Sequence, residues 1–349
     1  MTEQDIPARR GAGRVRLWVG GALMVLPAVF LLFLALEWAY ATSHLGVGRV
    51  PGLGNFEENV RALPAPRDEG RLRFAVLGDP EEGLGTYRHL MKKAREAGAD
   101  FVVITGDVAD RPTREGFEYF NWVYRSLGPD ALPTFAAIGN HDGPPQGFFR
   151  EYYGPDLFSF VHGDCLFIFA DNNHPRSFPE CESFVRQEIA RHRAVARHIF
   201  IVVHKPIIDF RREQGDLQNY RETGGYLYRI LDEEKVDAVL AGHFHGYMRQ
   251  EYKGTLLLVT GGAGSLLHAP DAFFHLVLID VGPDGLKDTV VRADVTDTFW
   301  DRLRFRLVVS WYPALFRDGR RISILVLPAV AVLALGFSIA RGRQRRAEA

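Results

Sequence analysis

Cysteine is scarce in this sequence, with only Cys165 and Cys181 among 349 residues. So few cysteines exclude a disulfide framework and a cysteine-rich zinc site, and the two could either pair in an oxidising compartment or remain free core thiols. An excess of positive charge is also missing, since the net charge is -1. Nucleic acid is therefore not expected as a partner, because phosphate backbones are bound by concentrated Lys and Arg.

Charged residues are missing from two apolar runs near the ends of the chain, residues 17–36 and 322–340. At about 1.5 Å rise per residue, about 20 residues span the roughly 30 Å hydrocarbon core of a bilayer. We therefore predict a transmembrane helix in each run. The alternative for the first run is a cleaved signal peptide, because Ala39-Tyr40-Ala41 resembles a cleavage site. The alternative for the second run is a buried core helix.

Arginines set the expected orientation of the two spans. Four of them precede the first span, whereas Arg49 is the first basic residue after it. We expect the basic N-terminus (1–16) and the basic C-terminal tail (341–349) in the cytoplasm, with the middle of the chain outside. Residues 37–70 are predicted to be a linker. Residues 299–321 are predicted to be a juxtamembrane segment that either lies on lipid headgroups or serves as an ordinary linker.

The middle of the chain, residues 71–298, alternates short apolar runs with helical patterns. The runs are FAVLGD, FVVITGD, TFAAIGN, CLFIFAD, IFIVVH and AVLAGH, and their composition predicts strands that are buried on both faces. Helices are predicted at 86–97, 115–127, 182–196 and 226–234. This alternation favours an α/β layered domain. The later runs LLLVTGGAG, FFHLVLIDVG and DTVVRADV favour a second, partly antiparallel sheet.

Polar residues follow the carboxyl ends of these runs, the edge at which ligands bind in open α/β sheets. They are Asp79, Asp107, Asn140, His204, His243 and His245. Each motif alone is weak, but the ordered set GD, GD, GNHD, a strand-end His and GHFH resembles the calcineurin-like metallophosphoesterases over residues 71–295. The resemblance implies a four-layer α/β/β/α sandwich with a two-metal centre.

The resemblance also implies a set of metal ligands. Asp107 would bridge two divalent ions. The other ligands would divide into Asp79 and His245 for one ion, and Asn140, His204 and His243 for the other. Two-metal hydrolysis needs a bridging carboxylate, further imidazole or carboxylate ligands, and open positions for water and substrate. The ions are expected to be Mn, Fe, Zn or Mg.

His141 is not expected to bind metal. By the resemblance it would protonate the leaving-group oxygen, and we predict that Asp142 holds its other ring nitrogen. The alternative is a turn-capping His-Asp pair.

One position departs from the family motif Asp-x-His, because this chain has Asp79-Pro80-Glu81. A carboxylate is a legitimate ligand for Zn, Mn, Fe or Mg, so Glu81 could fill the vacant place. It would shift the preference of that site toward oxygen-preferring ions such as Mn²⁺, Mg²⁺ or iron. The alternative is that Glu81 is a solvated loop residue and that the first ion has three protein ligands.

Further polar residues near the predicted rim could contact an anionic substrate. They are Arg211, Arg212, Arg221, Asn172 and His174. The alternative is that they belong to solvated loops. GGAGS at residues 261–265 lacks the lysine of a phosphate-binding P-loop, so a tight turn near the site is expected there.

The sequence as a whole predicts a membrane-anchored, binuclear metal-dependent phosphoesterase. Its expected substrate is a phosphate ester, in particular a phosphodiester on a lipid or lipid-linked molecule, attacked by a hydroxide that the metal ions hold. The alternatives are a nucleotide or phosphoprotein phosphatase and a non-catalytic phosphate-binding domain.

Overall fold

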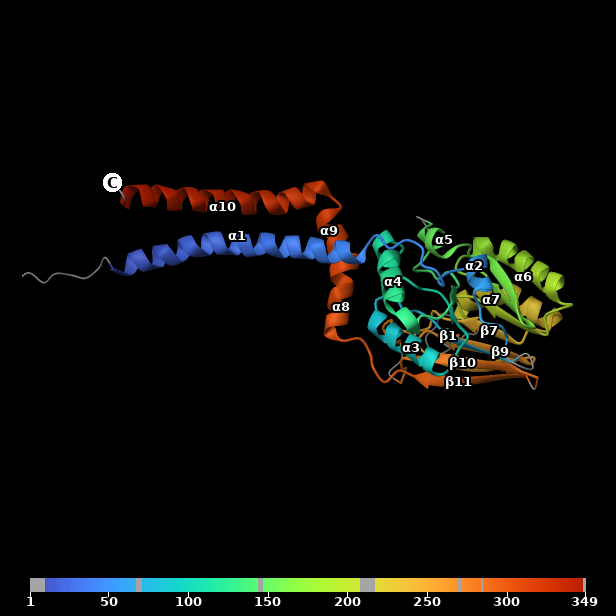
Figure 1. The fold of residues 1–349 in the computed structure, drawn as a ribbon. Helices are drawn as coiled ribbons and strands as arrows, with labels where there is room; N and C mark the ends of the chain where they lie inside the picture. Colours follow the sequence, from blue (N-terminus) through green and yellow to red (C-terminus); the bar gives the residue numbers. More distant parts are fainter. Residues whose placement is uncertain are drawn as a thin grey trace, which may run out of the picture. The chain divides into compact units, whose positions relative to one another are not determined.

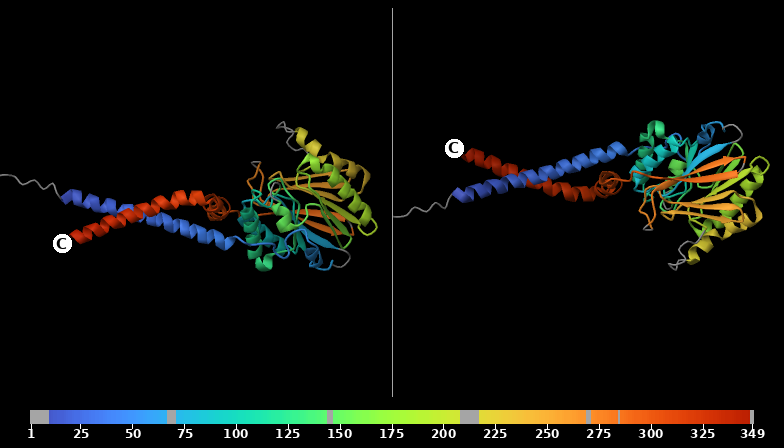
Figure 2. Two further views of the ribbon diagram at one scale, coloured as in Figure 1. Left: turned by 90° about the horizontal axis from the view of Figure 1, so that it is seen from above. Right: turned by 90° about the horizontal axis from the view of Figure 1, so that it is seen from below.

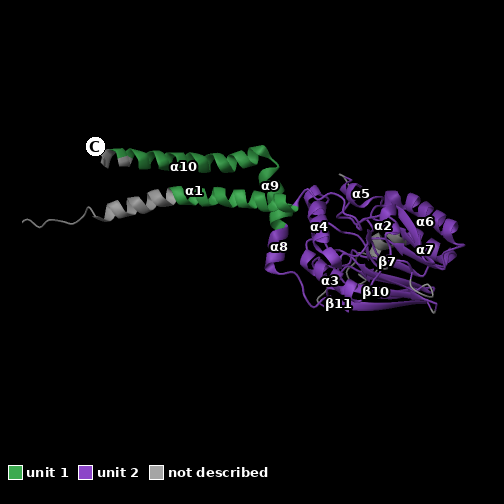
Figure 3. Cartoon of the chain, viewed as in Figure 1, with its two compact units in different colours: residues 1–44, 306–349 green, residues 45–305 purple. Residues whose placement is uncertain are grey.

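The computed structural model describes residues 10–66, 71–143, 147–207, 217–268, 271–283 and 285–347. The chain forms two compact units, which Figure 3 colours separately. One unit combines residues 1–44 and 306–349, and the other comprises residues 45–305. Each unit is described by itself below.

The first unit is a pair of long apolar helices, α1 (Arg10–His44) and α10 (Gly319–Ala347). They run in opposite directions and pack against each other (Figures 1 and 2). Two stretches in them, Met24–His44 and Gly319–Gly342, are long and apolar enough to cross a membrane.

Large apolar side chains point outward from both long helices. Leu26 and Leu36 of α1 are 70% and 61% exposed, and Ile324 and Leu327 of α10 are 71% and 66% exposed. An apolar surface of this extent is unfavourable in water and favourable against lipid. The π-helical turn η4 (Arg306–Trp311) and α9 (Tyr312–Phe316) directly precede α10 and run crosswise to the two long helices at one end of the pair (Figure 1).

The second unit contains two β-sheets. The first sheet has the strand order β11-β10-β1-β2-β3. Its strands are β1 (Leu72–Leu77), β2 (Phe101–Ile104), β3 (Thr134–Ala136), β10 (His275–Gly282) and β11 (Gly285–Arg292). β1, β2 and β3 are parallel, whereas β10 pairs antiparallel with β1 and with β11.

The second sheet has the order β4-β5-β6-β7-β9-β8. Its strands are β4 (Phe158–His162), β5 (Cys165–Phe169), β6 (His198–Val202), β7 (Ala238–Ala241), β8 (Tyr247–Tyr252) and β9 (Thr255–Thr260). β5, β6, β7 and β9 are parallel. The last predicted strands therefore do not form a sheet of their own, because β9 extends the second sheet while β10 and β11 extend the first.

Helices cover the outer faces of the two sheets. The longer ones are α3 (Leu84–Glu96), α4 (Arg114–Ser126), α6 (Phe178–His192) and α7 (Leu217–Glu233). The unit also contains the short helices α2 (Glu57–Arg61), η2 (Gly128–Asp130), α5 (Phe148–Tyr153), η3 (Pro175–Ser177) and α8 (Phe299–Phe305). All four predicted helices are present, and α7 begins nine residues before the predicted 226–234. The period of 3.6 marks the buried stripe of a helix but not its ends.

Side chains alternate between two cores, as a strand period of two requires. On β5, Phe167 and Phe169 face the first sheet, whereas Leu166 and Ile168 face α6 and α7. Phenylalanine rings fill the space between the sheets, and Phe74 meets Phe167 edge to face with 5.1 Å between centroids. Full burial of one such side chain contributes about 1.5–3 kcal/mol. The predicted four-layer α/β/β/α sandwich is confirmed.

Cys165 and Cys181 are free and buried, on β5 and α6 respectively. They belong to different cores, since Cys165 packs between the sheets and Cys181 packs under the helices. The two thiols are therefore core residues.

Candidate metal centre

The predicted site residues follow the carboxyl ends of strands from both sheets. Asp79 and Asp107 come after β1 and β2, and Asn140 comes after β3. His204 follows β6 and the GHFH motif follows β7. Because these five strands end at one edge of the sandwich, their loops can meet between the sheets.

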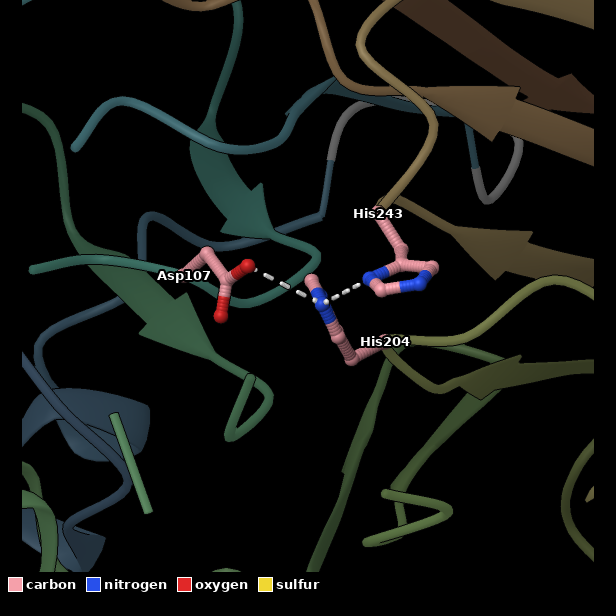
Figure 4. A group of neighbouring side chains, drawn as sticks. All are labelled: Asp107, His204 and His243. Carbon is pink, nitrogen blue, oxygen red and sulfur yellow. Dashed lines mark hydrogen bonds and ion pairs between the residues drawn. The ribbon is translucent and has the colours of Figure 1, made fainter. Parts of the chain in front are cut away.

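One group of ligand atoms surrounds His204. Its Nε2 lies 3.1 Å from Asp107 Oδ2, 2.9 Å from Asn140 Oδ1 and 3.1 Å from His243 Nδ1. Figure 4 shows the imidazole of His204 between Asp107 and His243. The ligand atoms of these three residues all lie within 4.8 Å of one another.

A second group combines Asp79, Glu81 and His245. His245 Nε2 lies 3.6 Å from Asp79 Oδ1 and 3.6 Å from Glu81 Oε1. Glu81 is only 7% exposed, and its Oε1 is buried without a hydrogen-bond partner. Asp79 connects the two groups, because both of its carboxylate oxygens accept from the backbone N–H of His243 at 3.1 Å. Glu81 is therefore not a solvated loop residue.

Backbone carbonyls hold the two buried imidazoles in a defined orientation. His204 Nδ1 bonds to Thr105 O at 2.9 Å, and His245 Nδ1 bonds to Leu266 O at 2.7 Å. A carbonyl oxygen can only accept, so each Nδ1 carries the proton and each Nε2 of the neutral ring presents a lone pair to the site. The orientation suits metal ligation.

The backbone is strained where the ligands lie. Among the described residues, positive φ occurs at five non-glycine positions, and four belong to this site: Asp79 (57°), Glu81 (41°), Asp107 (51°) and His243 (66°). Such conformations cost about 1–3 kcal/mol each and gather at functional sites. Gly139 has a related role, because a Cβ there would overlap Asp107.

Burial and the neighbouring imidazoles shift the carboxyl pKa values in opposite directions. Burial raises the pKa of Asp79, and it raises the pKa of Glu81 to about 7. Burial also opposes ionisation of Asp107, but the adjacent His204 lowers the pKa of Asp107 to about 2. Burial alone would lower the pKa of His204, but the attraction of the Asp107 carboxylate is stronger and raises that pKa to about 9. The cluster of buried carboxylates therefore favours a positive charge beside it, and a bound divalent cation would supply that charge.

The residues fit divalent cations. Carboxylate oxygens, an amide oxygen and imidazole nitrogens converge from loops of both sheets, and Glu81 Oε1 lacks any other partner. Asp107 connects the groups, since its carboxylate lies within 4.8 Å of the ligand atoms of His204 and His243 and also within 4.8 Å of a ligand atom of Glu81. A mixed oxygen and nitrogen donor set suits Mn, Fe, Zn or Mg.

The ring of His141 is oriented by a different residue from the one predicted. Its Nδ1 bonds to the backbone carbonyl of Asp110 at 2.7 Å, which leaves Nε2 as the nitrogen that can exchange a proton with a substrate. The prediction that Asp142 holds His141 is wrong. The Asp142 carboxylate accepts instead from the backbone N–H groups of Val108, Ala109 and Gly139. It therefore ties the loop after β2 to the loop after β3.

The predicted substrate residues lie in different environments. Arg211 and Arg212 are outside the described residues, as is the side chain of Arg221 in α7. His174 is exposed, and its Nδ1 accepts from the N–H of Arg176 at 3.2 Å. Asn172 is 0% exposed and uses both amide atoms on the backbone of Lys205. Its side chain braces the segment that follows His204 and is not open to a substrate.

Sequence reasoning missed Ser265. Residues 261–265 were expected to form a tight turn, and the structure instead lays them along the loop after β1, where Ser265 Oγ donates to Glu81 Oε2 at 2.5 Å. The two residues are 184 positions apart, and no local pattern marks a serine as the partner of a distant carboxylate.

Comparison with known proteins gives a matching family model and solved structures of similar fold. The model of the calcineurin-like phosphoesterase family matches residues 72–247. The solved purple acid phosphatase PPD1 from yellow lupin (Lupinus luteus) seeds has a TM-score of 0.54 and 18% identity, with 69% of this chain and 56% of that chain covered. This likeness shows the shared fold. A search of curated proteins finds no significant match.

Weaker structural likenesses include two further solved proteins. GAP50, the anchor in the inner membrane complex of Plasmodium, has a TM-score of 0.46 and 16% identity, with 66% of this chain and 87% of that chain covered. A putative 5'-nucleotidase from Staphylococcus aureus has a TM-score of 0.45 and 16% identity, with 69% and 58% covered.

Proposed function

Because the chain belongs to the calcineurin-like phosphoesterase family and is a metal-dependent hydrolase of phosphoric esters, we propose that it cleaves a phosphodiester on a lipid or lipid-linked substrate. The observation that carries the proposal is the convergence of two ligand groups at one edge of the sandwich, with Asp107 between them. The pair of apolar helices in the same chain would tether this domain to a membrane.

The proposed centre is binuclear. Asp107 would be shared between the ions, with Asn140, His204 and His243 on one side and Asp79, Glu81 and His245 on the other. When bound, divalent cations supply Lewis-acid polarisation of a phosphoryl oxygen and activation of a water molecule. The protein holds these donors rigidly through the Thr105 and Leu266 carbonyls and through the strained loops.

His141 would act on the leaving group. The Asp110 carbonyl fixes the proton of Nδ1, so Nε2 is free to carry the proton that the departing alcohol needs. When the P–O bond to the alcohol breaks, the electron pair goes to the alcohol oxygen and the Nε2 proton follows it. His174 and the three arginines of the 211–221 region remain proposed contacts for the substrate.

The membrane part of the proposal rests on α1 and α10. Their antiparallel packing leaves the N-terminal end of α1 and the C-terminal end of α10 at the same end of the pair (Figure 1). We propose two membrane spans with both termini in the cytoplasm, a catalytic domain at residues 71–298 outside, and a juxtamembrane segment at 299–321. A tethered enzyme meets lipid-borne substrates at a high effective concentration, and this favours a lipid-linked ester over a freely diffusing one.

The proposal is tested by comparing substrates on the full chain in detergent or lipid nanodiscs. We expect hydrolysis of bis(p-nitrophenyl) phosphate with Mn²⁺, its loss after chelation, and release of a phosphorylated headgroup from a membrane lipid extract. Faster turnover of soluble nucleotides or of phosphoprotein would contradict the lipid assignment. Absence of hydrolysis with Mn²⁺, Mg²⁺, Fe²⁺ or Zn²⁺ would leave a phosphate-binding domain as the correct description.

A further inference from the structure

Two loops that are far apart in sequence lie against each other beside the second ligand group. The loop after β1 contains Asp79 and Glu81, and residues 261–265 follow β9. Ala263 N donates to Gly78 O at 3.0 Å, and Ser265 N donates to Asp79 O at 3.0 Å. These bonds place Ser265 at the metal centre.

The loops approach so closely that both contact positions need glycine. A Cβ at Gly83 would overlap the backbone of Gly264, and a Cβ at Gly264, where φ is 159°, would overlap the backbone of Gly83. Two backbones in direct contact leave little freedom for the residues between them. The distance between Ser265 and Glu81 is thus set by the backbone.

Ser265 engages one oxygen of Glu81 and leaves the other one open. Ser265 is 1% exposed, and its hydroxyl donates to Glu81 Oε2 at 2.5 Å. Glu81 Oε1 has no partner and lies 3.6 Å from His245 Nε2. Ser265 Oγ is also 3.0 Å from His245 Nδ1, but that nitrogen already donates to Leu266 O. The hydroxyl proton therefore belongs to the carboxylate.

Glu81 has a second possible set of partners. It also offers one ligand atom to a group with Asp107 and His141, whose ligand atoms all lie within 4.8 Å of one another. Rotation toward that group would remove Oε1 from Asp79 and His245. The hydrogen bond from Ser265 to Oε2 opposes this rotation, because breaking it would leave the buried Ser265 hydroxyl without its acceptor.

We propose that Ser265 is a positioning residue that holds Glu81 as a one-oxygen ligand of the Asp79, Glu81 and His245 group. Together, Ser265 and Glu81 shift the preference of this group toward oxygen-seeking cations such as Mn²⁺, relative to a group with an imidazole in the place of Glu81. Hydrogen-bond partners of ligands affect metal affinity by about 10- to 100-fold. The inference rests on the proposed function, because it assumes that Glu81 binds metal.

The test measures metal affinity rather than activity. The metal-free full chain in detergent is titrated with Mn²⁺ and, separately, with Zn²⁺ by calorimetry, and bound Mn²⁺ is followed by electron paramagnetic resonance. We expect Ser265→Ala to weaken Mn²⁺ binding by about 10- to 100-fold and Zn²⁺ binding by less. Ser159→Ala is the matched control, because Ser159 Oγ donates to Glu188 Oε2, also at 2.5 Å, away from the site.

A double-mutant cycle shows whether Ser265 acts through Glu81. In the Glu81→Ala background, Ser265→Ala should cause no further loss of Mn²⁺ affinity. An equal loss in both backgrounds, or no loss in either, would overturn the positioning role. Circular dichroism and the melting temperature of each metal-free variant establish that it is folded.

The outcomes separate this inference from the proposed function. If Glu81→Ala leaves Mn²⁺ affinity unchanged, Glu81 is not a ligand and the inference falls with that assignment. If Glu81→Ala weakens Mn²⁺ binding and Ser265→Ala does not, only the inference falls. Failure to cleave lipid phosphodiesters would overturn the proposed substrate while leaving the affinities as expected.

Discussion

His141 and the metal ligands lie side by side but should respond differently to mutation. Removing the His141 imidazole deletes the proposed proton donor and leaves the proposed ligands in place, because the hydrogen bond from His141 to Asp107 comes from its backbone N–H. We expect His141→Ala to keep its metal content and to lose about 10²- to 10⁴-fold in turnover. Metal analysis by mass spectrometry and a diester assay measure the two quantities.

A histidine outside the site provides the control for this prediction. His192 lies at the end of α6 beside Glu188, and His192→Ala should change neither metal content nor turnover. Unaltered turnover in His141→Ala would remove the proton-donor role. A parallel loss of metal would mean that the imidazole is a ligand.

Asp142 should matter for stability, because its carboxylate accepts from three buried backbone N–H groups. Asp142→Ala leaves these donors unpaired, at about 1–3 kcal/mol each, so we expect the free energy of unfolding to fall by at least about 3 kcal/mol. Asp142→Asn keeps one acceptor oxygen and should lose less. Denaturant titration is the measurement, with exposed Asp271→Ala as the control.

The sheets themselves are linked by a buried histidine at the start of β10. His275 bonds to Thr260 at the end of β9 at 3.0 Å, so one side-chain contact joins a strand of each sheet. Burial lowers the pKa of His275, and Arg292, its cross-strand neighbour on β11, lowers it further. Its other ring nitrogen bonds to Phe273 O, and the ring meets Tyr247 edge to face.

This lowered pKa predicts acid sensitivity. The unfolded chain protonates His275 near its ordinary pKa of about 6.5, before the folded chain does, so the unfolded state binds more protons and the stability falls as the pH drops through that value. Above it both states are neutral and the effect vanishes. We expect His275→Gln to flatten the loss of melting temperature between pH 7 and pH 5. An unchanged slope would contradict the assignment.

The antiparallel pairing of α1 and α10 constrains how the whole molecule can sit in a membrane. Gly336 contributes to it, because a Cβ there would lie 2.6 Å from Met24 Cγ. If both helices span a bilayer, the two termini must emerge on the same side. Reporters that are active only in the cytoplasm should therefore give signal from both ends of the chain and none from an insertion after Gly254, in the turn between β8 and β9. Opposite signals from the two ends would refute the two-span arrangement.

The sequence alone determined most of the strands, but not β4 or β8, and the polar residues that follow them, because hydrophobic periodicity and the residues that close a strand are local properties. The convergence of Asp79, Asp107, Asn140, His204, His243 and His245 followed from that order, since parallel strands end at one edge. The allocation of β10 and β11 to the first sheet did not follow, because strand pairing depends on contacts between distant segments.

Only the tertiary structure decided which atoms the side chains contact. It paired Ser265 with Glu81, gave His141 the carbonyl of Asp110, and turned Asp142 and Asn172 toward the backbone. The physical reason is that a hydrogen bond depends on distance and angle between groups carried by separate loops, which residue identity does not specify. The sequence specifies the chemical type of each side chain, whereas the fold determines which group that side chain contacts.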